Sequence, residues 1–319
     1  MTSLLSPMVL SFGLGVIAAR LKSDLKFPDS LYTSLTIYLM VAIGMKGGYK
    51  LSSTPLSEII IPVLAAILLS ASIPFWIYWI TRRVGKFDKY NAAALAAHYG
   101  SVSAVTFSAA IAFQDGSNIA HEGFLPGLLA IMEIPAILIA IGLSRMNRTA
   151  DESASAIPLG NVVKELLAGK SSVLLIGFLL IGFISGHQGW EQVSPLLDIP
   201  FKGVLTLFLL EAGLVAGRKL SHLKQRGVFL FAFGIIMPVV HACLGIWLGK
   251  FAGLSEGGSV ILGILAASAS YIAAPAACRV ALPEASPSYY LTSSLAITFP
   301  FNIVIGIPLY HEIAKHVFG

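Results

Sequence analysis

Long apolar segments separated by short polar connections constrain this chain more than any other feature of its sequence. Each segment is close to the roughly 20 residues that an α-helix needs to cross a bilayer. The ten segments lie at residues 4–20, 28–49, 57–81, 91–113, 124–144, 171–186, 200–217, 228–250, 258–281 and 288–310. A segment in lipid has to satisfy its backbone hydrogen bonds internally, as a helix does. The sequence therefore predicts an all-α polytopic membrane protein with ten transmembrane helices.

The composition excludes several other classes of protein. Only 12% of the residues are charged, against about 25% in soluble proteins. The net charge of +5 is spread over loops, so it does not indicate nucleic-acid binding. Cys243 and Cys278 lie in apolar segments, where we expect small buried side chains rather than a disulfide or a metal site. The sequence has no HExxH, GxSxG or phosphate-loop motif, so it predicts neither an enzyme nor a bound cofactor.

The basic residues favour one side of the membrane. The connections after segments 1, 3, 5, 7 and 9 hold sixteen of the 21 Lys and Arg residues, with Arg279 counted at the end of segment 9. Because such residues accumulate in cytoplasmic loops, we expect an inner (plasma) membrane protein with both termini outside the cytoplasm. No basic residue precedes the first apolar run, Leu4–Ala19, so we expect no cleavable signal peptide.

The two halves of the chain resemble each other. The least apolar connection, residues 145–170, separates two sets of five segments. Three pairs of stretches match at a nearly constant offset: 44–52 with 213–221, 95–97 with 265–267, and 127–143 with 293–309. Apolar sequence aligns easily, so the shared offset indicates the repeat and no single pair does. Since five is odd, we predict two inverted repeats, residues 1–144 and 171–319, joined by a cytoplasmic linker at 145–170.

Small polar residues interrupt the fourth and ninth segments at corresponding places. The two stretches are His98–Ala112 and Ala266–Arg279. A helix interrupted there frees backbone N–H groups, and the positive end of a half-helix can then face an anion. The hydroxyls and amides that we expect around a small anion belong to Gly100, Ser101, Ser103, Thr106, Ser268, Ser270, Tyr271 and Ala273. Small residues also permit close helix packing, but the recurrence in both halves favours a binding site.

Three charged residues well inside the predicted spans are candidates for function. A carboxylate in a membrane usually faces a cavity or a partner, so Glu133 is a candidate for binding a coupling cation or a proton. Alternatively, Glu133 forms a structural pair with Lys46, which could itself attract the anion. Glu211 is the second acidic candidate. Asn302 is a candidate for satisfying backbone groups freed by Pro300.

These residues together resemble the sodium-dependent bicarbonate transporters described from cyanobacteria. The resemblance is carried by Gly100-Ser101-Val102-Ser103 with Thr106, by Met132–Ala136, by Ala266–Ile272 with Pro275, and by Pro283–Thr298. It implies a core and a gate domain that move by an elevator-like mechanism, and a homotrimer. It implies bicarbonate and sodium at the crossing of spans 4 and 9, which adds Val102 and Ile272 to the substrate-binding set. Ser103, Thr106, Glu133 and Ser270 are then the expected ligands of the coupling ion.

Two positions depart from the cyanobacterial pattern. Tyr271 stands where those members have an acidic residue, and Ala273 stands where they have a hydroxyl. Transport of another small carboxylate or anion, or coupling to protons, therefore stays open. The linker is shorter than in those members, so a PII-like regulatory partner remains possible but is not carried over from the resemblance. A non-transporting scaffold or sensor is a further alternative, but it would not need paired polar interruptions.

The charge bias predicts the topology. A reporter fused at Ala154 in the linker should read cytoplasmic, and one fused after Gly319 should read external. Two reporters on the same side would contradict the odd number of spans in each half, and with it the inverted repeat.

Overall fold

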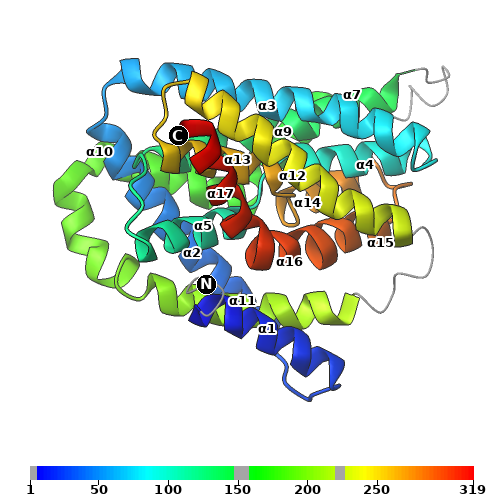
Figure 1. The fold of residues 1–319 in the computed structure, drawn as a ribbon, viewed down its shortest axis with the longest axis horizontal. Coiled ribbons are helices and arrows are strands. Elements are labelled where there is room, and N and C mark those ends of the chain that lie inside the picture. Colours follow the sequence, from blue (N-terminus) through cyan, green and yellow to red (C-terminus); the bar gives the residue numbers. More distant parts are fainter. Residues whose placement is uncertain (1–5, 147–157, 220–226) are drawn as a thin grey trace.

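A computed structural model describes residues 6–146, 158–219 and 227–319, and this part of the chain is all-helical, with short connections and no strand. Each of the ten predicted segments coincides with one or more helices, and the fourth and ninth segments are each interrupted (Figure 1). The helices are α1 (Pro7–Arg20), α2 (Asp29–Ser52), α3 (Leu56–Arg83), α4 (Lys89–Gly100), α5 (Ala104–Gly116), α6 (Leu125–Met132), α7 (Pro135–Arg145), α9 (Leu159–Ala168), α10 (Lys170–Leu197), α11 (Phe201–Lys219), α12 (Gly227–Phe251), α13 (Glu256–Ala267), α14 (Ala273–Ala281), α15 (Pro287–Leu291), α16 (Phe299–Phe301) and α17 (Ile307–Phe318). Two π-helical stretches, Thr292–Thr298 and Asn302–Gly306, flank α16.

Six helical stretches of the described chain are long and apolar enough to cross a membrane. They are Leu56–Arg83, Lys89–Gly116, Leu125–Arg145, Lys170–Leu197, Gly227–Phe251 and Pro287–Phe318. The remaining predicted segments coincide with α1, α2, α11 and the pair α13–α14. Among these, α1 and α13 are apolar but shorter than a span.

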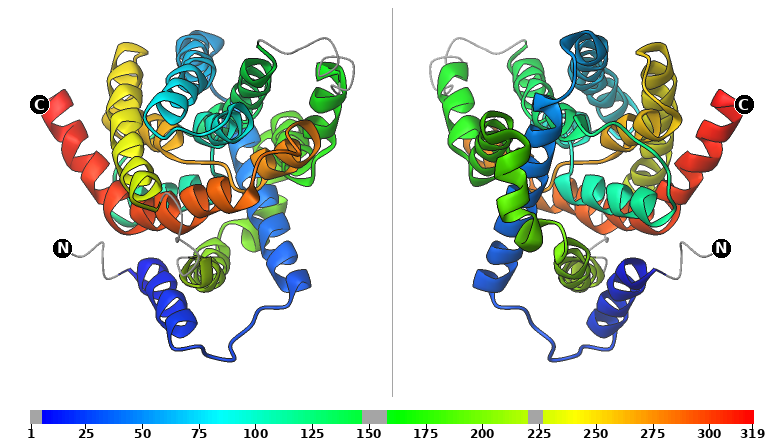
Figure 2. Two further views of the ribbon diagram at one scale, coloured as in Figure 1. Left: turned by 90° about the vertical axis from the view of Figure 1, so that its right-hand side faces the viewer. Right: turned by 90° about the vertical axis from the view of Figure 1, so that its left-hand side faces the viewer.

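Four helices form a group that lies against the rest of the molecule. In this four-helix group, which consists of α1, α2, α10 and α11, α1 packs along α11 and α10 packs along α2. We call the helices outside this group the body. Figure 2 shows α1 and α11 below the body. The pairing is crossed, because the first helix of each sequence half contacts the second helix of the other half.

Glycines allow the backbones in these pairs to touch. A Cβ atom on Gly15 of α1 would collide with the Leu210 carbonyl of α11, and one on Gly213 would collide with the Phe12 carbonyl. In the second pair, Gly48 faces the Leu179 carbonyl and Gly182 faces the Met45 carbonyl in the same way. Contact through small residues is how helices associate in lipid, where apolar side chains gain little from leaving their solvent.

The structure differs from the sequence predictions at the linker and at the sixth segment. Part of the predicted linker is the helix α9, which buries Val162 and Leu166 and packs on α10 and α14. Residues 147–157, including Ala154, lie outside the described residues. The apolar segment predicted at 171–186 continues as α10 to Leu197, with a kink at Gly186, where φ is 58°.

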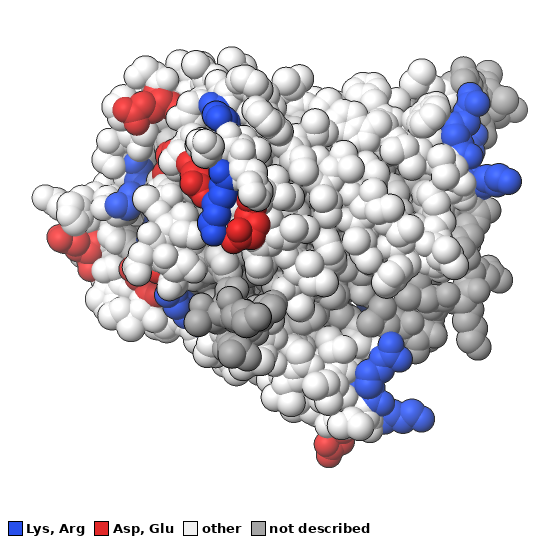
Figure 3. All heavy atoms as spheres, in the orientation of Figure 1, with Lys and Arg blue, Asp and Glu red and all other residues white. Residues whose placement is uncertain are grey.

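The charged side chains visible in Figure 3 lie toward the two ends of the molecule, with an uncharged band between them. At the right-hand end of this face they are mainly basic, and at the left-hand end basic and acidic groups mix. This distribution agrees with the alternation of Lys and Arg along the sequence.

The glycine contacts predict a matched pair of stability effects in α10. Gly182→Ala should destabilise the protein, because overpacking typically costs about 1–3 kcal/mol and the Met45 carbonyl is backbone that cannot swing away. Gly177→Ala in the same helix has no atom within 4 Å of the added methyl group, so it should gain about 0.5–1 kcal/mol of helix stability. Thermal unfolding in detergent measures both changes. Equal melting temperatures for the two variants would contradict the close contact between Gly182 and the Met45 carbonyl.

Candidate functional site

Two interrupted helices meet at the centre of the body. One interruption separates α4 from α5 at residues 101–103, and the other separates α13 from α14 at residues 268–272. The Ser103 N–H donates to Ser268 Oγ at 2.9 Å, and the Ser270 N–H donates to the His98 carbonyl at 2.8 Å. Each interruption therefore supplies a hydrogen-bond partner for a backbone group that the other interruption leaves free.

Polar side chains bind two further carbonyls near the site. Asn302 Nδ2 donates to the Ala267 carbonyl at the end of α13 (3.0 Å), and Tyr310 Oη orients its amide. The sequence predicts that Asn302 binds a backbone group freed by Pro300. That prediction is wrong, because the acceptor is the Ala267 carbonyl of another helix. Ser101 Oγ donates to the Glu133 carbonyl at 2.9 Å, across to the break between α6 and α7.

Ser103 and Ser270 accept hydrogen bonds from N–H groups in the first turns of the two half-helices that start at the site. Ser103 Oγ accepts the Thr106 N–H (3.2 Å) and the Thr106 hydroxyl (3.0 Å) at the start of α5. Ser270 Oγ accepts the Ala274 N–H (3.1 Å) at the start of α14. A hydroxyl that accepts in this way keeps its own hydrogen for another acceptor. Each serine can therefore cap its helix and donate to an anion at the same time.

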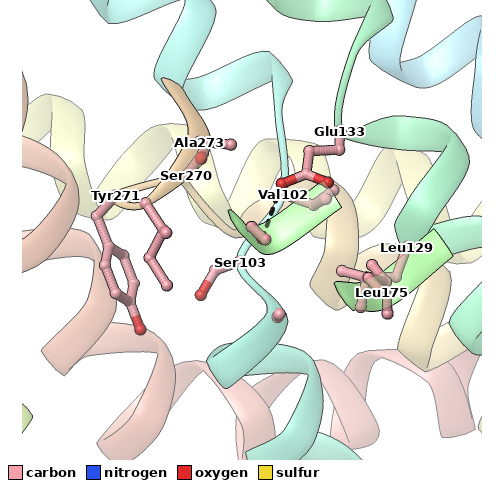
Figure 4. A pocket seen from close by; sticks show the side chains of 11 residues that line it. Val102, Ser103, Leu129, Glu133, Leu175, Ser270, Tyr271 and Ala273 are labelled. Carbon is pink, nitrogen blue, oxygen red and sulfur yellow. Dashed lines mark hydrogen bonds between the residues drawn. The ribbon is translucent and has the colours of Figure 1, made fainter. Parts of the chain in front are cut away.

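The half-helices α5 and α14 both begin at one small cavity, which we call the central cavity (Figure 4). Its volume of about 10 Å³ is room for about one water molecule. Its lining comes from both interruptions and from α6 and α10: Val102, Ser103, Ala104, Leu129, Glu133, Ser171, Leu175, Ser270, Tyr271, Ile272 and Ala273. The first residues of α5 and α14, Ala104 and Ala273, belong to this lining, so two positive helix ends border the cavity.

Glu133 supplies the carboxylate of the central cavity. It lies between α6 and α7, is only 6% exposed, and accepts hydrogen bonds from Ser171 Oγ (3.1 Å) and Ser172 Oγ (3.3 Å) in the first turn of α10. The alternative pairing of Glu133 with Lys46 is wrong, because Lys46 Nζ binds Asp198 Oδ1 at 2.9 Å. The lining of the cavity contains no Lys or Arg side chain.

Tyr271 forms the opposite wall of the central cavity. Its ring packs edge-on against Phe299, with 5.2 Å between ring centroids. Figure 4 shows the ring beside Ser103. Tyr271 Oη is buried and interacts with the Ser103 side chain, but it makes no well-formed hydrogen bond to a described residue. A buried hydroxyl without a good partner loses the bond that it would make to water, so this one is suited to a ligand.

The structure divides the residues predicted for the site into two groups. Those that line the central cavity are Val102, Ser103, Glu133, Ser270, Tyr271, Ile272 and Ala273. Gly100, Ser101, Thr106 and Ser268 lie beside it and hold the interruptions together. At Gly100 a Cβ atom would lie 2.7 Å from Pro74 Cγ and from Ala136 Cβ, so this glycine serves packing.

Sequence reasoning missed the serines of α10 and the apolar wall. Ser171 and Ser172 open an apolar segment directly after Lys170, a pattern that the start of any helix could show. Leu129 and Leu175 carry no signal that distinguishes them from other apolar residues. Only the fold brings the start of α10 against Glu133.

Comparison with known families gives one extensive match. The profile of the Na⁺-dependent bicarbonate transporter superfamily matches residues 7–315. No curated protein matches the chain significantly. Because the family match covers nearly the whole sequence, the chain belongs to the Na⁺-dependent bicarbonate transporter superfamily. It is therefore a multi-pass membrane transport protein and not an enzyme.

Proposed function

We propose that this protein is a secondary transporter that imports bicarbonate together with sodium, with both ions bound at the central cavity. The observation that carries the proposal is the meeting of two helix N-termini and one carboxylate at a single cavity. Helix N-termini bind anions through their unpaired N–H groups, and the hydroxyls of Ser103, Ser270 and Tyr271 add donors. Membership of the superfamily supports bicarbonate and sodium as the transported ions.

The charges of the central cavity explain why an anion would need a cation there. Glu133 and a bound bicarbonate are both negative, and two unit charges about 6 Å apart repel by roughly 3 kcal/mol at an effective dielectric constant of about 20. That is about a hundredfold in affinity. A sodium ion between them, with oxygen ligands from Glu133 and nearby hydroxyls, would remove the penalty. In this proposal the two ions bind together for that reason.

The lining has to separate before bicarbonate can enter. The central cavity has room for about one water molecule, so an anion of four heavy atoms needs a larger space. Four larger cavities lie between the four-helix group and the body, with volumes of about 640, 220, 290 and 420 Å³. Loosely packed contacts along this whole boundary support an elevator-like movement of the body against the four-helix group, which would be the gate.

The cavity linings also support the inverted repeat. The cavity near Lys46 is lined on the four-helix group by Ala42, Lys46, Lys50, Asp198 and Phe201, among others. The cavity near Glu211 is lined there by Glu211, Val215, Lys219, Asp29 and Tyr32. These positions correspond one by one at the offset of 169 that aligns residues 44–52 with 213–221. We therefore propose ten spans in two inverted repeats, residues 1–144 and 171–319; the homotrimer and the external termini stay predictions.

Replacing Glu133 by Gln tests the ion coupling. The variant keeps the size and shape of the side chain but removes the negative charge, so bicarbonate should bind without sodium. Uptake of labelled bicarbonate into liposomes should lose its dependence on a sodium gradient. Wild-type uptake should require sodium, and unlabelled acetate or formate should not compete with bicarbonate.

Several outcomes would contradict this assignment. Sodium-dependent uptake by the Glu133→Gln variant at the wild-type rate would place Glu133 in a structural role. Wild-type uptake driven by a proton gradient alone would favour proton coupling. Competition by acetate would favour a broader carboxylate substrate. No uptake of any anion by the folded wild-type protein would contradict transport of small anions altogether.

Ser103 and Ser270 test the anion site from the two halves. Each Ala variant removes one donor to a charged ligand, which should weaken bicarbonate binding by about 1.5–3 kcal/mol. Because the two residues would share one ligand, the double variant should deviate from additivity. Leu variants should bind less still, since the cavity has no space for a larger side chain.

Stability has to be measured on the same variants. Loss of a helix cap costs about 0.5–2 kcal/mol of stability, so the Ala variants should melt at lower temperature even where no ligand is present. Ser108→Ala is a matched control, because Ser108 Oγ donates within α5 to the Ala104 carbonyl. Full bicarbonate binding by both Ala variants would limit these serines to capping and packing.

A further inference from the structure

A second carboxylate lies near the central cavity and has no role in the proposed function. Glu211 on α11 is 8% exposed, and its Oε2 atom has no hydrogen-bond partner among the described residues. It lines a cavity of about 420 Å³ between the four-helix group and α14 and α15 of the body. We call this the Glu211 cavity and define it by Asp29, Tyr32, Glu211, Lys219, Tyr271 and Arg279. A buried ionisable group inside a membrane protein usually marks an ion pathway.

We infer that Glu211 and Asp29 bind a small monovalent cation in the Glu211 cavity. Asp29 is close enough to act electrostatically on Glu211. The hydroxyls of Tyr32 and Tyr271 line the same space. Carboxylate and hydroxyl oxygens are the ligands that hard cations take. A cation would satisfy the unpartnered oxygen of Glu211 and would offset the repulsion between the two acidic groups.

The corresponding cavity of the other half shows what makes this one different. At the matched position of the Lys46 cavity, Asp198 is neutralised by its ion pair with Lys46. In the Glu211 cavity Val215 stands in place of that lysine, and Glu211 stands in place of Ala42. One half thus gains an acidic group and loses the cation that would pair with Asp29. The two cavities share their frame but differ in the charge that they offer to an ion.

The basic residues of the Glu211 cavity lie farther along the same helices. Lys219 follows Glu211 by eight residues on α11, which is about 12 Å along a helix, and Arg279 lies in the last turn of α14. Arg279 Nε also donates to the Pro275 carbonyl, at 3.3 Å. Arg218 acts electrostatically on Glu211 and donates to the Leu25 carbonyl at 2.9 Å. The part of the cavity beside Glu211 therefore favours a cation, and the part beside Lys219 and Arg279 favours an anion.

Tyr271 places this cation site next to the central cavity. Tyr271 lines both cavities. In this inference, a cation that leaves Glu133 would pass the Tyr271 ring to reach Glu211. The site depends on the proposed function only for the choice of sodium as the ion. It would serve as a second binding position between the central cavity and the Lys219–Arg279 end.

Equilibrium binding of ²²Na⁺ to the purified full-length protein tests the inference without any transported anion. Choline chloride holds the ionic strength constant. Glu211→Gln should weaken one class of sodium sites at least tenfold, and Asp29→Asn should weaken it about threefold to tenfold. Glu211→Asp should recover part of the affinity. In a Glu133→Gln background, Glu211→Gln should remove the remaining saturable sodium binding.

Asp198→Asn is the matched control, since Asp198 corresponds to Asp29 but is already paired with Lys46. It should leave sodium affinity unchanged within twofold. Sodium binding by Glu211→Gln and Asp29→Asn with wild-type stoichiometry and affinity would overturn the inference. So would a lower melting temperature with unchanged sodium binding, which would mean that Glu211 only balances Arg218. If Glu211→Gln does not fold, Asp29→Asn and Tyr32→Phe decide the question.

The outcomes separate this inference from the proposed function. Sodium-dependent bicarbonate uptake by the wild type, with unaltered sodium binding by both acidic variants, would reject the Glu211 site alone. Loss of a sodium site in Glu211→Gln, without bicarbonate uptake by the wild type, would reject the proposed function and retain the site.

Discussion

The reciprocal hydrogen bonds between the two helix interruptions are the interaction on which the rest of the structure depends. An interrupted helix in a membrane leaves backbone groups without partners, and each one buried unpaired costs several kcal/mol. Here the Ser270 N–H binds the His98 carbonyl, and the Ser103 N–H binds Ser268 Oγ. Neither interruption is satisfied in this way without the other. The two halves of the chain therefore have to meet at this point, and the starts of α5 and α14 meet with them.

Much of the fold follows from the sequence because lipid allows few alternatives. Apolar length and the required internal hydrogen bonding predict helices at every segment, and the small polar residues around Ser103 and Ser270 predict where two of them break. Other features depend on contacts between distant residues. Nothing local to Glu133 indicates that Ser171 and Ser172 would bind it, and nothing local to Lys46 indicates Asp198 as its partner. Charged pairs inside a membrane protein depend on which helices touch, and the local sequence does not contain that information.

The residues predicted for the site show the same division. The sequence pattern groups hydroxyl and small residues as one class, but in the structure they have different roles. The hydroxyls of Ser101 and Ser268 donate hydrogen bonds to the backbone carbonyls of Glu133 and Leu265, respectively. Ser103 and Ser270 instead accept from helix N–H groups and border the central cavity. Residue type and spacing identify the interruption, whereas the direction of each side chain depends on which backbone group lies within reach.

The proposed inverted repeat would account for the architecture, and departures from it would account for differences between the two ends. An inverted repeat places corresponding residues at opposite ends of the molecule, so identical halves would present the same charges on both sides. The Lys46 and Glu211 cavities share five corresponding positions on the four-helix group. Lysine faces Asp198 in one cavity, whereas valine and an added glutamate accompany Asp29 in the other. If the proposed transport is correct, a cation would therefore meet different electrostatic surroundings in the two cavities, although their positions on the four-helix group correspond.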